Sequence, residues 1–90
     1  MTEKDILCIV YGRNTQYNTE SMILRLKNYS SVKVSIQNID DNRVICKSLG
    51  WDDASTPLCV FKSGNTVLGT LLGIKTDKEL TEFISSLITN

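Results

Sequence analysis

Apolar and polar positions in the first third of the chain follow a strand pattern and then a helix pattern. The continuous apolar run Ile6–Val10 precedes Gly12 and is typical of a strand buried on both faces. Residues 19–29 carry apolar side chains at three- and four-residue steps, which predicts an amphipathic helix; they are Met22, Ile23, Leu26 and Tyr29. Asn18 and Thr19 are the candidate N-cap residues of this helix.

The middle of the chain predicts a second strand followed by a short helix. Residues 31–39 place an apolar side chain at every second position, as in a strand with one covered face. The acidic and amide side chains of residues 40–42 then offer caps for a helix that runs to Leu49 and ends at Gly50.

The last third predicts a hairpin and a final helix. Pro57 precedes a short apolar strand, Leu58–Phe61, and a turn with Gly64 at its centre connects that strand to another over residues 66–72. Residues 76–79, Thr-Asp-Lys-Glu, fit a capping box. The helix behind this box carries an apolar stripe formed by Leu80, Phe83, Ile84 and Leu87.

The predicted order is therefore β-α-β-α-β-β-α. A helix joins the first two strands, so they should run parallel, while the closing hairpin is antiparallel. We expect an α/β fold with a four-stranded mixed sheet flanked by three helices. Ninety residues suffice for one such domain, spanning 1–90.

The charge balance narrows the range of partners. Ten basic and ten acidic residues give a formal net charge of zero, which leaves no electrostatic footprint for nucleic acid or an acidic membrane. The start, MTEKD, lacks the apolar core of a secretory signal, and no apolar run approaches the roughly 18 residues of a membrane span. We expect a cytoplasmic protein without a nucleic-acid or membrane partner.

The residues available for chemistry are few. The chain has no His, and its three cysteines, Cys8, Cys46 and Cys59, include no C-x-x-C spacing. We therefore expect no metal site and no cofactor, and the commonest general base is missing. Cys8 and Cys59 are expected in the core, and a disulfide between them would need near-opposite register on neighbouring strands. Cys46, on the short helix, is the cysteine expected to lie nearest to solvent.

Two segments resemble thioredoxins. They are NIDDNRVICKSLGW, residues 38–51, and STPLCVFKSGNTVLGTLLGIKTDKELTEFI, residues 55–84. The second contains a Thr-Pro at a strand start, an F-K-x-G hairpin turn and a final amphipathic helix. The resemblance covers roughly the last fifty residues, and the N-terminal part matches in pattern only, with a size closer to a glutaredoxin. It implies the thioredoxin/glutaredoxin fold.

The same resemblance places the family's C-x-x-C motif on Thr15, Gln16, Tyr17 and Asn18. The glutaredoxin form, C-P-Y-C, would put its Tyr on Tyr17, but both sulfurs are missing. The buried acid that moves protons in thioredoxins falls on Ile9. The resemblance therefore implies a domain that has lost dithiol exchange, because that reaction needs an accessible thiolate.

The Thr56-Pro57 pair matches the family's cis-proline, which lies beside the C-x-x-C loop and leaves the preceding backbone open to an extended peptide. An alternative is that Pro57 only begins a strand, which is a permitted place for proline. Arg13 and Trp51 are further candidates for the rim of this groove. Trp51 has a second interpretation, in which it folds back over the sheet beside solvated turn aspartates.

Three functions follow as hypotheses. The first is a redox-inactive module that binds a protein or peptide through the rim formed by Arg13, Thr15, Gln16, Tyr17, Asn18, Trp51, Thr56 and Pro57. The second is a degenerate oxidoreductase or glutathione-binding protein that uses a lone thiol, Cys46 or Cys59. The third is a structural subunit of a larger assembly, so that the chain is either a monomer or a partner-bound subunit.

Overall fold

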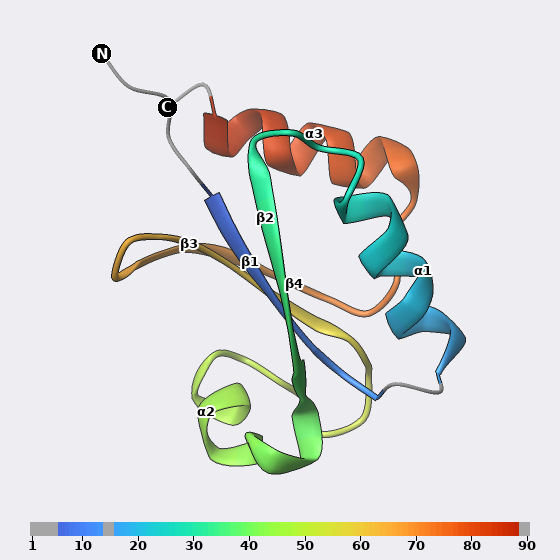
Figure 1. Cartoon of the computed structure of the whole chain (residues 1–90). Helices are drawn as coiled ribbons and strands as arrows, with labels where there is room; N and C mark the ends of the chain where they lie inside the picture. The colour runs from blue at the N-terminus through green and yellow to red at the C-terminus, as the bar shows by residue number, and fades with distance from the viewer. Residues whose placement is uncertain (1–5, 14–15, 89–90) are drawn as a thin grey trace.

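The computed structural model describes residues 6–13 and 16–88. Along these residues the elements are β1 (Ile6–Gly12), α1 (Tyr17–Leu26), β2 (Val32–Asn38), a 3-10 turn (Ile39–Asp41), α2 (Arg43–Ser48), β3 (Leu58–Ser63), β4 (Thr66–Leu72) and α3 (Asp77–Ile88) (Figure 1). The predicted order of strands and helices is confirmed. The main differences from the prediction lie at the ends of elements and in what covers each face of the sheet.

The strands of the described residues form one mixed sheet in the order β2-β1-β3-β4. β1 runs parallel to β2, with Ile6 opposite Val32, and antiparallel to β3, with Tyr11 opposite Leu58. β3 and β4 form the predicted antiparallel hairpin. Because β1 lies between β2 and β3, its C-terminal end opens directly onto the loop before α1 and the segment before β3.

One face of the sheet is covered by α1 and α3. Their inward residues, Met22 and Leu26 from α1 and Leu80 and Ile84 from α3, are buried against Phe61 and its neighbours on the sheet. The apolar stripes predicted for both helices are thus confirmed, with Ile23, Tyr29, Phe83 and Leu87 packed at the margin. Each fully buried side chain of this size contributes about 1.5–3 kcal/mol of transfer free energy.

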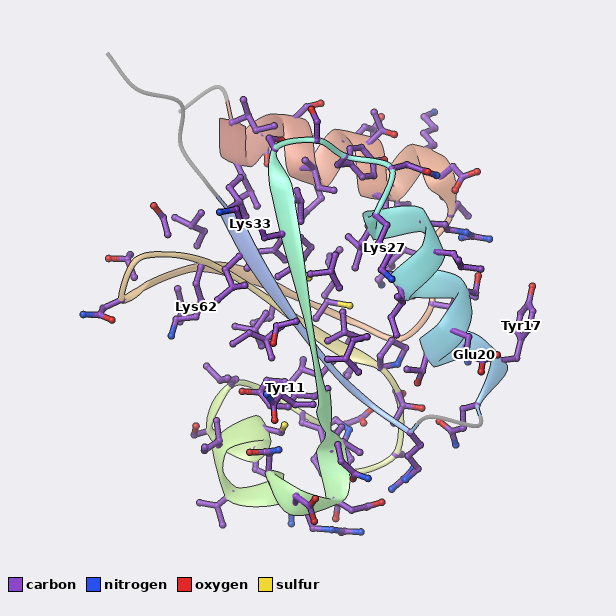
Figure 2. The ribbon with its side chains drawn as sticks, viewed as in Figure 1. Tyr11, Tyr17, Glu20, Lys27, Lys33 and Lys62 are labelled. Atoms are coloured by element: carbon purple, nitrogen blue, oxygen red, sulfur yellow. The ribbon has the colours of Figure 1, made fainter. Side chains whose placement is uncertain are left out.

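The opposite face is covered by the shorter helix α2 at one end only. Cys46 and Trp51 pack there against Tyr11 and Leu58, and Figure 2 shows Tyr11 beside α2. At the other end of β1, Leu7 is 37% exposed. The prediction that β1 is buried on both faces is therefore wrong for this end, because a six-residue helix is too short to span the sheet.

The start of α1 also differs from the prediction. Gln16 occupies the N-cap position without a side-chain cap, and Thr19 lies within the helix. Thr19 is 1% exposed, and its Oγ1 accepts a hydrogen bond from the Arg13 amide at 3.3 Å. A Cβ on Gly12 would meet that same Oγ1 at 2.4 Å, so only glycine allows β1 to end this close to α1.

The capping box of α3 is confirmed. The Thr76 amide donates to Glu79 Oε1 at 3.0 Å, and the Glu79 amide donates to Thr76 Oγ1 at 3.1 Å. The cap predicted for α2 is not formed in this way, because the Asn42 side chain donates instead to the Asn38 carbonyl at 2.8 Å. Gly50 follows that helix with a φ of +103°, as expected for a terminating glycine.

Candidate functional site

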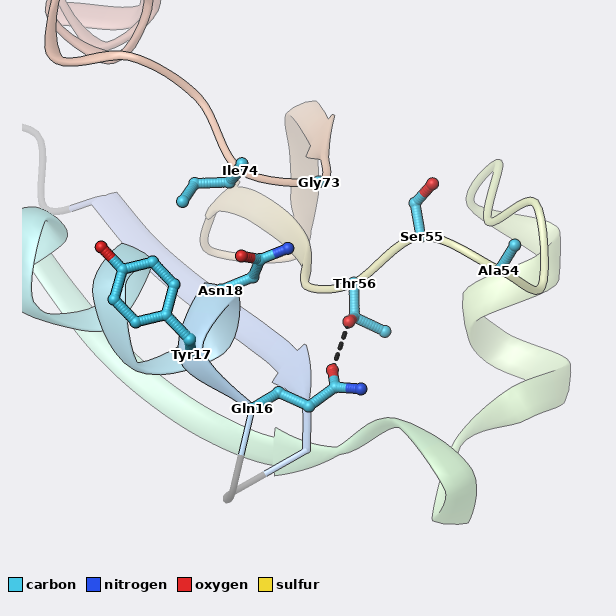
Figure 3. Close-up of a pocket in the computed structure, with 8 residues that line it drawn as sticks. All are labelled: Gln16, Tyr17, Asn18, Ala54, Ser55, Thr56, Gly73 and Ile74. Carbon is cyan, nitrogen blue, oxygen red and sulfur yellow. Dashed lines mark hydrogen bonds between the residues drawn. The ribbon is translucent and has the colours of Figure 1, made fainter.

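Three segments that are distant in sequence meet at an open pocket of about 570 Å3. They are the start of α1, the loop before β3, and the chain leaving β4, all grouped beyond the C-terminal end of β1. The lining residues, drawn in Figure 3, are Gln16, Tyr17, Asn18, Ala54, Ser55, Thr56, Gly73 and Ile74. The pocket therefore lies at the position where the sequence placed the candidate rim.

A hydrogen bond from Thr56 Oγ1 to Gln16 Oε1 joins two of these segments (Figure 3). The Thr56–Pro57 peptide bond is cis, and the Pro57 carbonyl accepts from the Gly73 amide at 2.9 Å. Among residues 6–13 and 16–88, no backbone or side-chain group bonds to the backbone amide or carbonyl of Thr56. One donor and one acceptor of the main chain thus have no partner among the described residues, on a residue that lines the pocket.

The outer wall of the pocket is apolar. Tyr17 is 72% exposed and Ile74 is 40% exposed. In Figure 3 the Asn18 side chain lies among Tyr17, Thr56 and Ile74, so an amide group stands beside these apolar surfaces. A phenol ring and a branched aliphatic chain therefore stand at this wall, beside the Thr56 backbone, which has no hydrogen-bond partner among the described residues.

Arg13 is placed close to the pocket but faces elsewhere. Its guanidinium donates to both carboxylate oxygens of Asp40, at 3.0 and 2.9 Å, and Asp40 also accepts from Arg43 at 2.9 Å. The Arg13 contact lowers the pKa of Asp40 from 3.8 to about 2. Arg13 therefore holds the loop after β1 against the turn after β2, and it does not line the pocket.

Trp51 is buried, with 5% of its surface exposed. Its Nε1 donates to the Ser55 carbonyl at 2.8 Å, and the Arg43 guanidinium lies 5.8 Å from its ring centroid. The carboxylate of Asp52 accepts from the Ser55 amide at 2.8 Å, and such bonds lower the pKa of Asp52. Of the two interpretations of Trp51, the structure supports the one in which the ring folds back. It packs under the loop that carries Ser55 and offers no exposed aromatic surface to a partner.

The structure brings together four of the eight rim residues expected from sequence: Gln16, Tyr17, Asn18 and Thr56. Pro57 follows Thr56 and is fully buried, and Thr15 lies outside the described residues. Sequence reasoning missed Ala54, Ser55, Gly73 and Ile74. Gly73 has a φ of +80° and lies where the chain leaves β4. A glycine at the end of a predicted strand was the only sequence feature that could have pointed to Gly73 and Ile74.

The cysteines lie away from the pocket. Cys8, Cys46 and Cys59 are free thiols with no exposed surface, so the expectation that Cys46 reaches solvent is wrong. Its helix presses it into the α2 side of the core, and burial raises its pKa. Cys8 lies opposite Phe61, one diagonal step from Cys59; a hydrogen bond with the Cys59 thiol, followed by burial, raises the pKa of Cys8.

Two further findings concern ligands and membranes. In the part of the chain that the structure describes, no group of three or more His, Cys, Asp or Glu side chains is arranged to hold a metal ion. The helices within residues 6–13 and 16–88 are all too short or too polar to cross a bilayer.

The element order, the sheet topology and the site at the end of β1 define a thioredoxin-like α/β fold. A mutant thioredoxin from Halobacterium salinarum NRC-1 superposes with a TM-score of 0.72 and 12% identity, over 94% of this chain and 76% of that one. Mitochondrial thioredoxin 3 from Saccharomyces cerevisiae superposes with a TM-score of 0.66 and 17% identity, over 92% of this chain and 79% of that one. No protein-family model and no curated protein matches the sequence. The likeness thus establishes the fold, while activity has to be argued from the site.

Proposed function

We propose that this protein binds an extended segment of a partner protein in the pocket beside Pro57 and does not catalyse dithiol exchange. The observation that carries the proposal is that the backbone amide and carbonyl of Thr56 have no partner among residues 6–13 and 16–88, next to the exposed ring of Tyr17. An extended segment would pair with the Thr56 amide and carbonyl as an added strand does. Its side chains would rest on Tyr17 and Ile74.

The absence of dithiol exchange is supported by where the sulfur atoms lie. The reaction requires an attacking thiolate with access to its target. Hydroxyl, amide and apolar groups line the described pocket, and all three cysteines of the chain are buried. The alternative with a lone reactive thiol would require Cys46 or Cys59 at the surface, and both are fully enclosed. Free thiols are usual in a reducing compartment, which supports the cytoplasmic location as part of this proposal.

Co-purification of the tagged chain from its native host tests the binding role. A partner that uses the pocket should be retained by the native chain and lost with Tyr17→Ala, because the ring contributes exposed contact area. Val44→Ala is the matched control: Val44 is 83% exposed, on α2, and lies outside the pocket. Equal retention by both variants would refute the role of the pocket.

An insulin-reduction assay tests the redox half of the proposal separately. The chain should give no disulfide reduction above the reductant alone, because no accessible thiol is present. Measurable turnover that disappears in a Cys46→Ser or Cys59→Ser variant would instead establish the lone-thiol alternative.

A further inference from the structure

The sheet face on the α2 side is open at the end away from the pocket. The cluster under α2 takes in Tyr11, Leu58 and Val60, and Ile9 lies at its margin. Beyond Ile9, Leu7 is 37% exposed although β1 is paired on both sides. Val67, on β4, is 44% exposed at the same end. An interior strand with a half-exposed leucine indicates a surface that another element can cover.

The strand register places two lysines on either side of this leucine. Leu7 pairs with Lys33 on β2 and with Lys62 on β3, and Lys62 pairs with Val67 on β4. Directly paired residues point to the same face of a sheet, so these four side chains form one row. Figure 2 shows Lys33 and Lys62 projecting to the side away from α1. We call this row, Lys33-Leu7-Lys62-Val67, the lysine face.

Nothing within the sheet neutralises the lysine face. Neither Lys33 nor Lys62 takes part in the ion pairs found among the described residues, which gather around Asp40, Asp53 and Asp77. None of the four described strands contains an Asp or a Glu. The next row toward α2 is also uncharged: Ser35, Ile9, Val60 and Thr70. Two positive charges with apolar surface between them are therefore presented to the outside.

We propose that the lysine face docks an amphipathic helix of a partner protein whose apolar stripe has acidic residues along both edges. Strands lie about 4.8 Å apart, so Lys33 and Lys62, two strands from each other, stand roughly 10 Å apart. A helix with its side chains is about 10–12 Å wide. Laid along β1, it covers Leu7 and Ile9 with its stripe and brings one acidic edge to each lysine.

The chemistry distinguishes this occupant from a phosphate-bearing one. Ion pairs at an exposed surface contribute little affinity but set orientation, whereas covering Leu7 and Ile9 supplies the apolar contact. A nucleic acid would meet the lysines but leave the apolar row in water. The lysine face lies at the N-terminal end of β1 and the pocket lies beyond its C-terminal end, so the two sites are independent.

The probes are two synthetic peptides of about 18 residues, roughly 27 Å long as helices. Both carry a leucine stripe; one has glutamates along both edges, and the other has lysines. Titrated into the full chain and followed by amide NMR shifts, the acidic peptide should shift Leu7, Ile9 and Lys62. Lys33→Glu/Lys62→Glu should weaken its binding by about tenfold, since two exposed ion pairs become two repulsive contacts, and should favour the basic peptide.

Lys27→Glu/Lys78→Glu is the matched control, since both lysines are exposed and belong to the opposite side, Lys27 as the C-cap residue of α1 and Lys78 within α3. Each exchange lowers the net charge by two, so both double variants fall from zero to minus four. Equal weakening in the two variants would overturn the proposal, as would shifts confined to the pocket. A concentration-dependent dimer that the Lys33/Lys62 variant abolishes would also overturn it, in favour of a second copy, and so would tight binding of single-stranded RNA at this face.

Discussion

Replacing Gly12 with alanine tests how closely β1 approaches the start of α1. The added Cβ would lie 2.4 Å from Oγ1, 2.6 Å from Cγ2 and 3.0 Å from Cβ of Thr19, whereas comfortable contacts between such atoms are about 3.5–4.0 Å. Thr19 has no free space to turn into, because it is 1% exposed and its hydroxyl accepts the Arg13 amide. The strand end and the helix must therefore move apart, next to the pocket.

The cost follows from two opposing effects. Overpacking of a buried site costs about 1–3 kcal/mol, and replacing glycine restores about 0.4–1 kcal/mol by restricting the unfolded chain. Since all three Thr19 atoms would lie at or within 3.0 Å, the overpacking cost should fall in the upper part of its range, about 2–3 kcal/mol, and we expect Gly12→Ala to lower the free energy of unfolding by about 1–2.5 kcal/mol. For a chain of this size that corresponds to a fall in Tm of roughly 5–15 °C.

Urea unfolding followed by far-UV circular dichroism measures this loss, and a double-mutant cycle assigns it to Thr19. Thr19→Ala alone should cost about 0.5–1.5 kcal/mol for the hydrogen bond to Arg13. In that background Gly12→Ala should cost less than about 0.5 kcal/mol, because the two closest atoms are gone. The close packing of Gly12 on Thr19 would be refuted if Gly12→Ala lowered the free energy of unfolding equally in the native and Thr19→Ala backgrounds. It would also be refuted if Gly12→Ala caused no loss in either background.

Three further predictions concern a buried core residue, the Arg13–Asp40 ion pair and the buried cysteines. Ile84→Ala should lower the free energy of unfolding by about 2–5 kcal/mol, whereas Val44→Ala, at 83% exposure, should change it by less than about 0.5 kcal/mol; a similar loss for both would contradict the core assignment. Because Arg13 holds the folded pKa of Asp40 at about 2 against an ordinary 3.8, their interaction stabilises the fold above pH 3.8 and is lost as the pH falls toward 2. Urea unfolding between pH 2 and 5 should therefore show a shallower acid loss for Asp40→Asn, and an identical pH profile would speak against the ion pair. Ellman's reagent should find no reactive thiol in the native protein and three after denaturation; a fast-reacting native thiol would show that a cysteine is accessible.

The spacing of apolar residues was sufficient to predict the helices α1 and α3, because the apolar stripe of each packs against the sheet. The three- and four-residue steps through Met22 and Leu26, and through Leu80 and Ile84, correspond to the sides of α1 and α3 that pack on the sheet. The coverage of the other face was not predictable in this way. Leu7 belongs to an unbroken apolar run, and only the length and position of α2 leave it exposed.

Local chemistry at the site was harder to predict than the fold. Thr19 resembled a cap residue in sequence, but the close approach of Gly12 draws it inside the helix, a tertiary effect that no local pattern contains. Arg13 looked available for a ligand until the turn after β2 brought Asp40 to it. Ala54 and Ser55 carry no chemical signal, and they reach the pocket only because Trp51 and Asp52 fix the loop that presents them.

The most direct test of the central claim is hydrogen exchange at the Thr56 amide, measured by NMR with and without the partner that co-purifies with the chain. The amide has no partner among the described residues, and Thr56 lines the pocket. If an extended segment pairs with it, exchange at Thr56 should slow when the partner is present, and Tyr17→Ala should abolish that protection. Unchanged exchange at Thr56, with protection appearing at another surface instead, would contradict the assignment of the pocket as the binding site.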